Sequence, residues 1–232
     1  MVAAAAGSGL VGRLREVGAQ RYHDKHPFHQ ALVAGTLSRE AVQAWVGNRY
    51  YYQKAIPIKD AYVLASLPSA AYRRAWIVRI LDHDGTAERQ GGTEKWLALG
   101  RAVGLRDEDV LAERYVAPGT RFAVDAYVEF ARRRPWLEAV ASSLTELFGP
   151  PVMVARVAAI VAKYPWIERS ALAYFEDRLE FARRDAELAL SWVTAHATTP
   201  ELEDACVAAL GFKCDVLWSI LDATALASGT LR

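Results

Sequence analysis

Apolar residues recur along this chain at steps of three and four, which is the period of an amphipathic helix. We find no convincing stretch of strict alternation between apolar and polar residues, so no β-strand is predicted. The pattern predicts helices over about residues 9–22, 38–66, 68–83 and 152–163, and two long final helices introduced by Pro165 and Pro200. The chain is therefore expected to be all-α.

The length and composition are those of a well-packed globular protein. A chain of 232 residues with 53% hydrophobic content can bury a full core. We expect one helical domain over residues 1–232, with residues 1–8 as a disordered tail. Because that tail has no basic leader before its short apolar run, it is a poor signal peptide.

The predicted helix over residues 38–66 carries charge on the face that should be buried. Steps of three and four place one stripe on that face: Val42, Trp45, Arg49, Tyr52, Ile56, Lys59 and Val63. A charge in a protein core is costly unless it is paired. Either acids from other helices meet Arg49 and Lys59, or long side chains reach water, or the stripe lines a cavity for an anionic ligand.

The last two helices repeat this anomaly. Lys213 occupies a position where the apolar phase of the final helix demands a buried residue, and Tyr174 and Arg178 lie beside the stripe of the preceding helix. His83 and Tyr127 also fall on buried faces. Such a set suits a small polycarboxylate, because arginine and lysine bind carboxylates and histidine transfers protons near neutral pH.

Several other classes of function are disfavoured. The net charge of +1 gives no general attraction to nucleic acid or to an anionic membrane. No uncharged apolar run approaches the ~20 residues of a membrane span. No Gly-rich phosphate loop, Gly-x-Ser-x-Gly elbow or Glu-x-x-His pair occurs, and Pro27 interrupts the helical face that His23, His26 and His29 would need as metal ligands. No metal site is expected.

The two cysteines indicate the redox state of the cellular compartment in which the protein is expected. Cys206 and Cys214 lie eight residues apart in one predicted helix, so their backbones would be roughly 12 Å apart, too far for a disulfide. Both fall on the apolar stripe and are interpreted as packing residues. A reducing cytoplasm is therefore expected.

Longer motifs resemble the pyrroloquinoline-quinone synthase family over about residues 21–227. The matching stretches are Tyr22–His23, His26–His29, Asn48–Gln53, Ile56–Asp60, Arg79–Gly85, Arg121–Tyr127, Ser142–Phe148, Phe212–Lys213 and Leu217–Trp218. The resemblance implies a compact bundle of about seven helices, similar to haem oxygenase and the thiaminase-like proteins, that forms a homodimer.

The same resemblance implies the last step of pyrroloquinoline quinone (PQQ) biosynthesis. A tricarboxylated quinone precursor would undergo ring closure and an eight-electron oxidation by O2, with release of H2O2 and PQQ as product. No metal or organic cofactor would take part. The substrate supplies the polycarboxylate that the buried cations favour.

Residue roles follow from the resemblance, position by position. Substrate carboxylates would bind at Arg49, Lys59, Arg156 and Lys213. His83 would be the principal general base, with Tyr174 and Arg178 on the oxygen-binding side. The remaining pocket residues would orient the substrate and move protons: His23, Tyr52, Gln53 and Tyr127. Of the whole set, His83, Tyr174, Arg178 and His23 are the expected catalytic residues.

The chain departs from the family pattern at Met153, where a second pocket histidine is usual. Methionine cannot transfer a proton, so one alternative is an impaired protein that carries PQQ or its precursor. A second alternative is a thiaminase-like hydrolase on the same bundle, which would need a nucleophilic cysteine.

Overall fold

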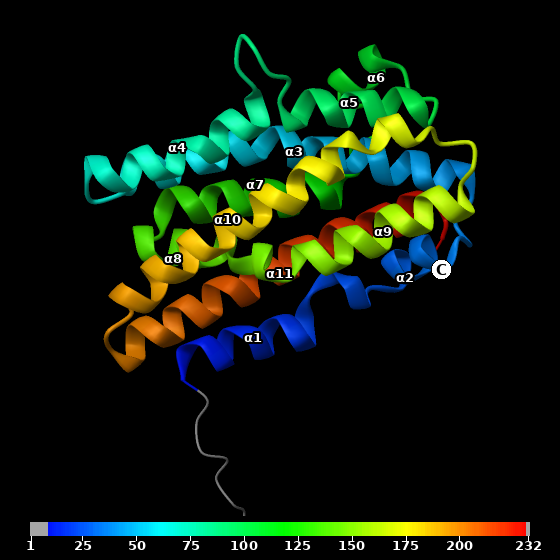
Figure 1. Ribbon diagram of the computed structural model, residues 1–232. Helices are drawn as coiled ribbons and strands as arrows, with labels where there is room; N and C mark the ends of the chain where they lie inside the picture. The colour runs from blue at the N-terminus through cyan, green and yellow to red at the C-terminus, as the bar shows by residue number, and fades with distance from the viewer. Residues whose placement is uncertain (1–8, 231–232) are drawn as a thin grey trace, which may run out of the picture.

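The computed structural model describes residues 9–230, and the tail predicted over residues 1–8 lies outside the described residues. This described part contains eleven α-helices, three short 3-10 helices and no strand, so the all-α prediction is confirmed (Figure 1). The elements are α1 (Leu10–Arg21), η1 (His23–Lys25), α2 (Pro27–Ala34), α3 (Arg39–Ser66), α4 (Ala70–Asp84), α5 (Gly92–Ala102), α6 (Asp107–Leu111), α7 (Pro118–Arg133), α8 (Trp136–Ala141), η2 (Ser142–Leu147), α9 (Gly149–Lys163), η3 (Arg169–Leu172), α10 (Ala173–His196) and α11 (Pro200–Ala227).

The expected count of about seven helices is wrong, since residues 9–230 hold eleven. Short elements account for much of the difference: α6 has five residues and α8 has six. The predicted start of the helix over 152–163 is also late. Helix α9 begins at Gly149, and Pro150 and Pro151 occupy its first turn, where a missing backbone N–H leaves no hydrogen bond unmade.

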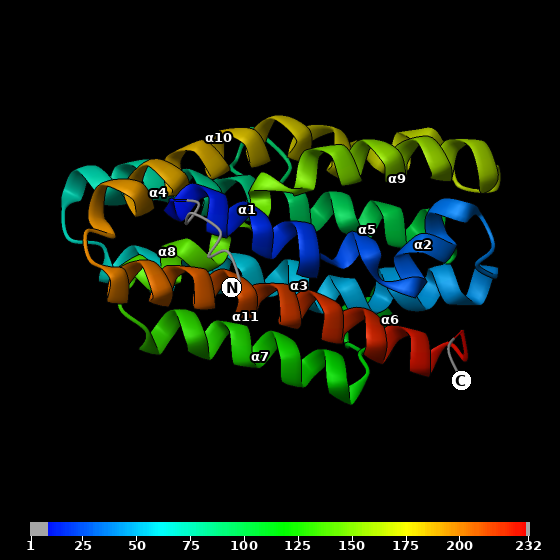
Figure 2. The ribbon, with the colours of Figure 1, turned by 90° about the horizontal axis from the view of Figure 1, so that it is seen from below.

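Helix α3 is the central element of the bundle. The Ser38 hydroxyl caps it by accepting a hydrogen bond from the Ala41 N–H at 3.2 Å. The helix packs against α4, α5, α7 and α11, and Figure 2 shows α11 between α3 and the viewer. The apolar members of the predicted stripe, from Val42 to Val63, are all buried, so the stripe does face the core.

The hydrophobic core is divided into two clusters, and α3 contributes to both. Its first half joins Trp45 to Trp96 of α5 and Phe175 of α10. Its second half joins Ile56 and Val63 to residues of α7, α8 and α11. Buried polar side chains lie where the two clusters meet. The polar site thus lies inside the bundle.

The junction of η2 and α9 shapes one wall of that polar region. Phe148 ends η2 and begins α9, and the segments Trp136–Leu147 and Gly149–Lys163 are bent by 41°. No single helix within residues 9–230 is long and apolar enough to cross a membrane, although this bent pair meets the length and composition test together.

Candidate active site

A buried cavity lies between the two core clusters, with walls from α3, α4, η2, α9 and α10 and from the turn after α1. Eight of the eleven predicted site residues line it: His23, Arg49, Tyr52, Gln53, His83, Arg156, Tyr174 and Arg178. These residues come from five separate elements. The fold therefore brings together most of the set that the family resemblance implied.

Lys59, Tyr127 and Lys213 do not line the cavity but form a layer directly behind Tyr52. The Lys213 Nζ donates a hydrogen bond to the Tyr52 hydroxyl at 2.7 Å and lies 3.5 Å from the centre of the Tyr127 ring. The Lys59 Nζ lies 5.4 Å from the same ring. Lys213 therefore acts on the cavity through the Tyr52 hydroxyl.

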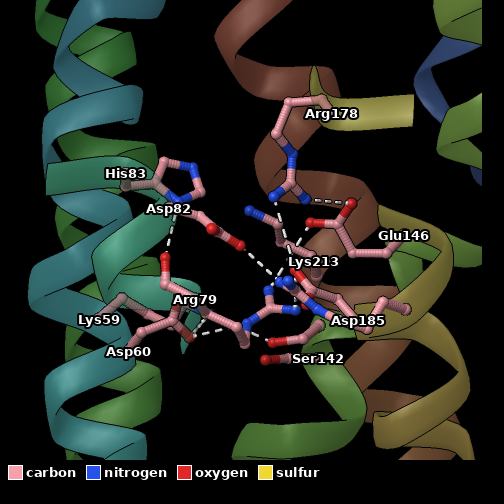
Figure 3. A network of polar contacts seen from close by, with 12 residues as sticks. Lys59, Asp60, Arg79, Asp82, His83, Ser142, Glu146, Arg178, Asp185 and Lys213 are labelled. Atoms are coloured by element: carbon pink, nitrogen blue, oxygen red, sulfur yellow. Dashed lines mark hydrogen bonds and ion pairs between the residues drawn. The ribbon is translucent and has the colours of Figure 1, made fainter. Parts of the chain in front are cut away.

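Some of the buried cations are paired with acids in one network (Figure 3). The Lys59 Nζ lies 2.5 Å from Oδ1 of Asp60. Arg178 contacts Glu146 at 2.9 Å and Asp185 at 3.5 Å. Both cations are therefore paired with acids, Lys59 within its own helix α3 and Arg178 with Glu146 of η2.

Arg79, which the sequence analysis did not single out, is at the centre of this network. It lies 2.8 Å from Asp185, 3.5 Å from Asp60 and 3.7 Å from Glu146. Burial opposes its charge, yet Asp185 and Asp60 raise the pKa of Arg79 above its usual value. Burial likewise opposes ionisation of Asp185, but Arg79 and Arg178 hold the pKa of that carboxyl below its usual range.

Three other cations, Arg49, Arg156 and Lys213, have no acid within 4 Å among residues 9–230. The Arg49 guanidinium lies over the Tyr52 ring, 4.1 Å from its centre. Burial and the nearby Arg49 lower the pKa of Arg156 to about 10. Burial, Lys59 and Arg49 lower the pKa of Lys213 well below its usual value. In both cases burial and neighbouring cations oppose the positive charge.

His83 is held as a neutral base facing the cavity. Its Nδ1 lies 3.1 Å from the Arg79 carbonyl oxygen, which assigns the proton to Nδ1 and leaves the lone pair on Nε2. That Nε2 is buried and has no hydrogen-bond partner within the described part of the chain. Burial and Arg178 lower the pKa of His83 to about 4, so the ring is neutral at pH 7.

The buried histidines make folding sensitive to acid. The folded pKa of His83, about 4, lies below its ordinary value near 6.5, so the unfolded chain binds more protons between these pH values. Stability should therefore fall as the pH drops. From pH 6.5 to pH 5, His83 alone accounts for about 1.5 kcal/mol of the free energy of unfolding. Urea titrations at both pH values should show this loss in the wild type and less of it in His83→Asn; equal losses in both proteins would contradict the assignment.

Arg156 connects two histidines across one wall of the cavity. Its Nη2 donates to Nε2 of His23 at 3.3 Å and to Nδ1 of His29 at 3.2 Å. On the opposite wall the Tyr174 hydroxyl donates to Oε1 of Gln53 at 2.9 Å. Buried atoms on the cavity-lining side chains lack partners within residues 9–230, namely His23 Nδ1, Gln53 Nε2, His83 Nε2 and Arg156 Nε. Such a concentration of unsatisfied polar atoms is typical of a ligand site.

Residues 12–223 match the model of the TENA/THI-4/PQQC family. The chain belongs to this family. It is 54% identical over 214 residues to the pyrroloquinoline-quinone synthase of Acidiphilium cryptum strain JF-5, covering 92% of this chain and 87% of that one. The pyrroloquinoline-quinone synthase of Pseudomonas aeruginosa strain PAO1 is 52% identical, with 92% and 85% covered.

A third relative in the TENA/THI-4/PQQC family is longer. It is the bifunctional coenzyme PQQ synthesis protein C/D of Methylorubrum extorquens strain AM1, 52% identical over 92% of this chain and 58% of its own length. Solved structures support the fold. A TenA homologue from Pseudomonas syringae pv. tomato superposes with a TM-score of 0.76 at 12% identity, covering 94% of this chain and 93% of that one. A Shewanella denitrificans domain with a heme oxygenase-like fold gives 0.73 at 16% identity, covering 93% and 88%.

Two features of this TENA/THI-4/PQQC chain were not predicted as site components. Glu146 lines the cavity and forms an ion pair with Arg178. It lies in the 3-10 segment η2, where the α-helical period does not predict which side chains face the interior. Gly91 allows the loop after α4 to close, since a Cβ there would lie 2.3 Å from the His83 carbonyl oxygen. Met153 also lines the cavity, as the sequence analysis expected of this position.

Proposed function

We propose that this chain is a pyrroloquinoline-quinone synthase. It closes a further ring on a bicyclic, tricarboxylated quinone precursor and oxidises the product by eight electrons, with O2 as acceptor and H2O2 released. One observation carries the proposal: three cations without acids, Arg49, Arg156 and Lys213, gather at one buried site. Relatives more than 50% identical over nearly the whole chain bear the same name.

The charge distribution supports two separate roles within the cavity, substrate binding on one side and oxygen reduction on the other. The side formed by Arg49 and Arg156, with Lys213 behind Tyr52, would hold the substrate carboxylates, since charge-assisted hydrogen bonds are the strong ones. The side formed by Arg178 is already balanced by Glu146 at 2.9 Å. It would therefore keep its geometry and stabilise negative charge as O2 is reduced.

Proton transfer is assigned to His83. Its unpartnered Nε2 would accept protons from the substrate as electrons leave the ring, and a bound anion would raise its pKa toward neutrality. Tyr174, hydrogen-bonded to Gln53, would contribute on the oxygen side. His23 would position the substrate and move protons beside Arg156. Lys59 and Tyr127 would hold Lys213 in place behind Tyr52.

The reaction is proposed to need no metal and no organic cofactor. Chelation tests this expectation directly. We also propose that the chain forms a homodimer, as the family resemblance implies, and that it acts in the cytoplasm. The two buried, free thiols of Cys206 and Cys214 are consistent with a reducing compartment.

The two alternative functions fit the site less well. A thiaminase-like hydrolase needs an activated cysteine, but neither cysteine lines the cavity, and burial raises the pKa of both Cys206 and Cys214 to about 11. A carrier that binds without turnover is favoured only by Met153. His83, His23 and Tyr174 remain available there for proton transfer.

Oxygen uptake tests the proposed function. Chelator-treated protein is mixed with the ring-open quinone precursor in air, while dissolved O2 and PQQ absorbance are followed. O2 consumption with complete conversion supports a cofactorless synthase in which Met153 is tolerated. A spectral change on binding without O2 consumption would contradict the synthase and favour the carrier.

A further inference from the structure

A second hollow lies on the outside of the cavity wall. It is an open groove of about 740 Å³ between α1, α2 and α9, with an apolar floor that includes Leu147, Phe148 and Ala155. That volume falls in the range of small-molecule sites. The cavity measures only about 60 Å³, so a bicyclic ligand cannot enter it unless a wall moves.

The groove and the cavity share two wall residues, Tyr22 and Val152. The Tyr22 ring lies 5.5 Å from the ring of Phe148, centre to centre. Phe148 packs on bare backbone of α1, because a Cβ on Gly18 would lie 2.2 Å from its Cζ. Phe148 is also the residue between η2 and α9. Side chains at a helix junction therefore form part of the partition.

Positive charge continues from the groove to the cavity. Arg15, Lys25 and Lys163 line the groove, and among its lining residues only Asp24, 2.7 Å from Lys25, carries the opposite charge. The His29 side chain lies in the groove wall and accepts a hydrogen bond from Arg156, which lines the cavity. An anion in the groove would therefore meet cations along the whole path inward.

We propose that this groove is the entrance site for the polycarboxylated aromatic ligand, and that Tyr22 and Phe148 form the door to the cavity. The apolar floor receives the flat ring, and the cations on the rim receive its carboxylates. The ligand enters, and PQQ leaves, when the two rings separate at the η2–α9 junction. This inference rests on the proposed function and adds a route to it.

Ala155→Trp tests the route, because the exposed Ala155 lines the groove and not the cavity. The matched control is Ala158→Trp, an exposed alanine on the same helix that does not line the groove. Stopped-flow mixing with PQQ gives the association and dissociation rate constants. A tryptophan that blocks the groove should lower both rate constants at least about tenfold. It should leave the Kd nearly unchanged, since a barrier slows entry and exit equally.

Each outcome has a distinct meaning. Slower exchange in Ala155→Trp alone supports the entrance. Unchanged rate constants would overturn it and leave the groove for another occupant, such as a partner protein. A changed Kd with an unchanged association rate would also overturn it, because the groove would then belong to the final binding site. If the wild type does not bind PQQ, the proposed function itself fails.

Discussion

His83→Asn should slow oxidation of the precursor by about 10²- to 10⁴-fold, the range typical of a lost general base. Asparagine can still donate to the Arg79 carbonyl oxygen as Nδ1 of His83 does, but it lacks the basic Nε2 that faces the cavity. The expected loss is therefore in kcat. Affinity for PQQ should change little, because no carboxylate partner is removed.

Single-turnover oxidation and equilibrium binding of PQQ separate these quantities. His29→Asn is a useful control, since His29 is a buried histidine that contacts Arg156 from outside the cavity-lining set. It should retain most of the oxidation rate. If His83→Asn oxidises the precursor at the wild-type rate, His83 is not the base, and His23 becomes the candidate to test.

Lys213→Met should stabilise the protein and weaken PQQ binding at the same time. Lys213 is 1% exposed and its only hydrogen bond within residues 9–230 goes to Tyr52, so folding must bury a cation that no acid balances. Replacing it with an apolar side chain of similar length should add about 1–3 kcal/mol to the free energy of unfolding. Without the Lys213 charge behind it, the Tyr52 hydroxyl should bind a carboxylate less strongly, which should raise the Kd for PQQ about 10- to 100-fold.

Arg79→Met is the matched control, because Arg79 is equally buried but paired. Removing it takes one buried cationic partner from Asp60 and one from Asp185, which should cost about 3–5 kcal/mol. Urea denaturation and PQQ titration of both variants measure the contrast. If Lys213→Met is destabilised as much as Arg79→Met while its Kd is unchanged, Lys213 is structural and the interpretation of the unpaired cations is wrong.

Much of the fold follows from local pattern. The period of three and four predicted an all-α chain, and Ser38 predicted the start of α3 at Arg39. The expected count of about seven helices came from the family resemblance, and it fell short partly because of the short helices α6 and α8. The start of α9 did not follow from the pattern, since two prolines open a helix there that they would have broken if placed further in.

The sequence predicted most of the residues of the site but not the ion pairs among them. Periodicity marked Arg49, Lys59 and Lys213 as misplaced charges, yet it could not say which of them would find an acid. Lys59 pairs with Asp60, its neighbour on the same helix, whereas the partner of Arg178 depends on the packing of another element, as Glu146 of η2 shows. Arg79 was missed because α4 alone gives no sign that this arginine faces three acids on α3, η2 and α10.

The most direct test of the central claim needs no mutation. Titrating the wild-type protein with PQQ and with its trimethyl ester compares the same ring with and without its three charges. If Arg49, Arg156 and Lys213 recognise the carboxylates, the ester should bind about a thousandfold or more weakly, since each charged hydrogen bond contributes about 1.5–3 kcal/mol. Equal affinity for the two compounds would contradict the account, because the unpaired cations would then have no part in binding the substrate.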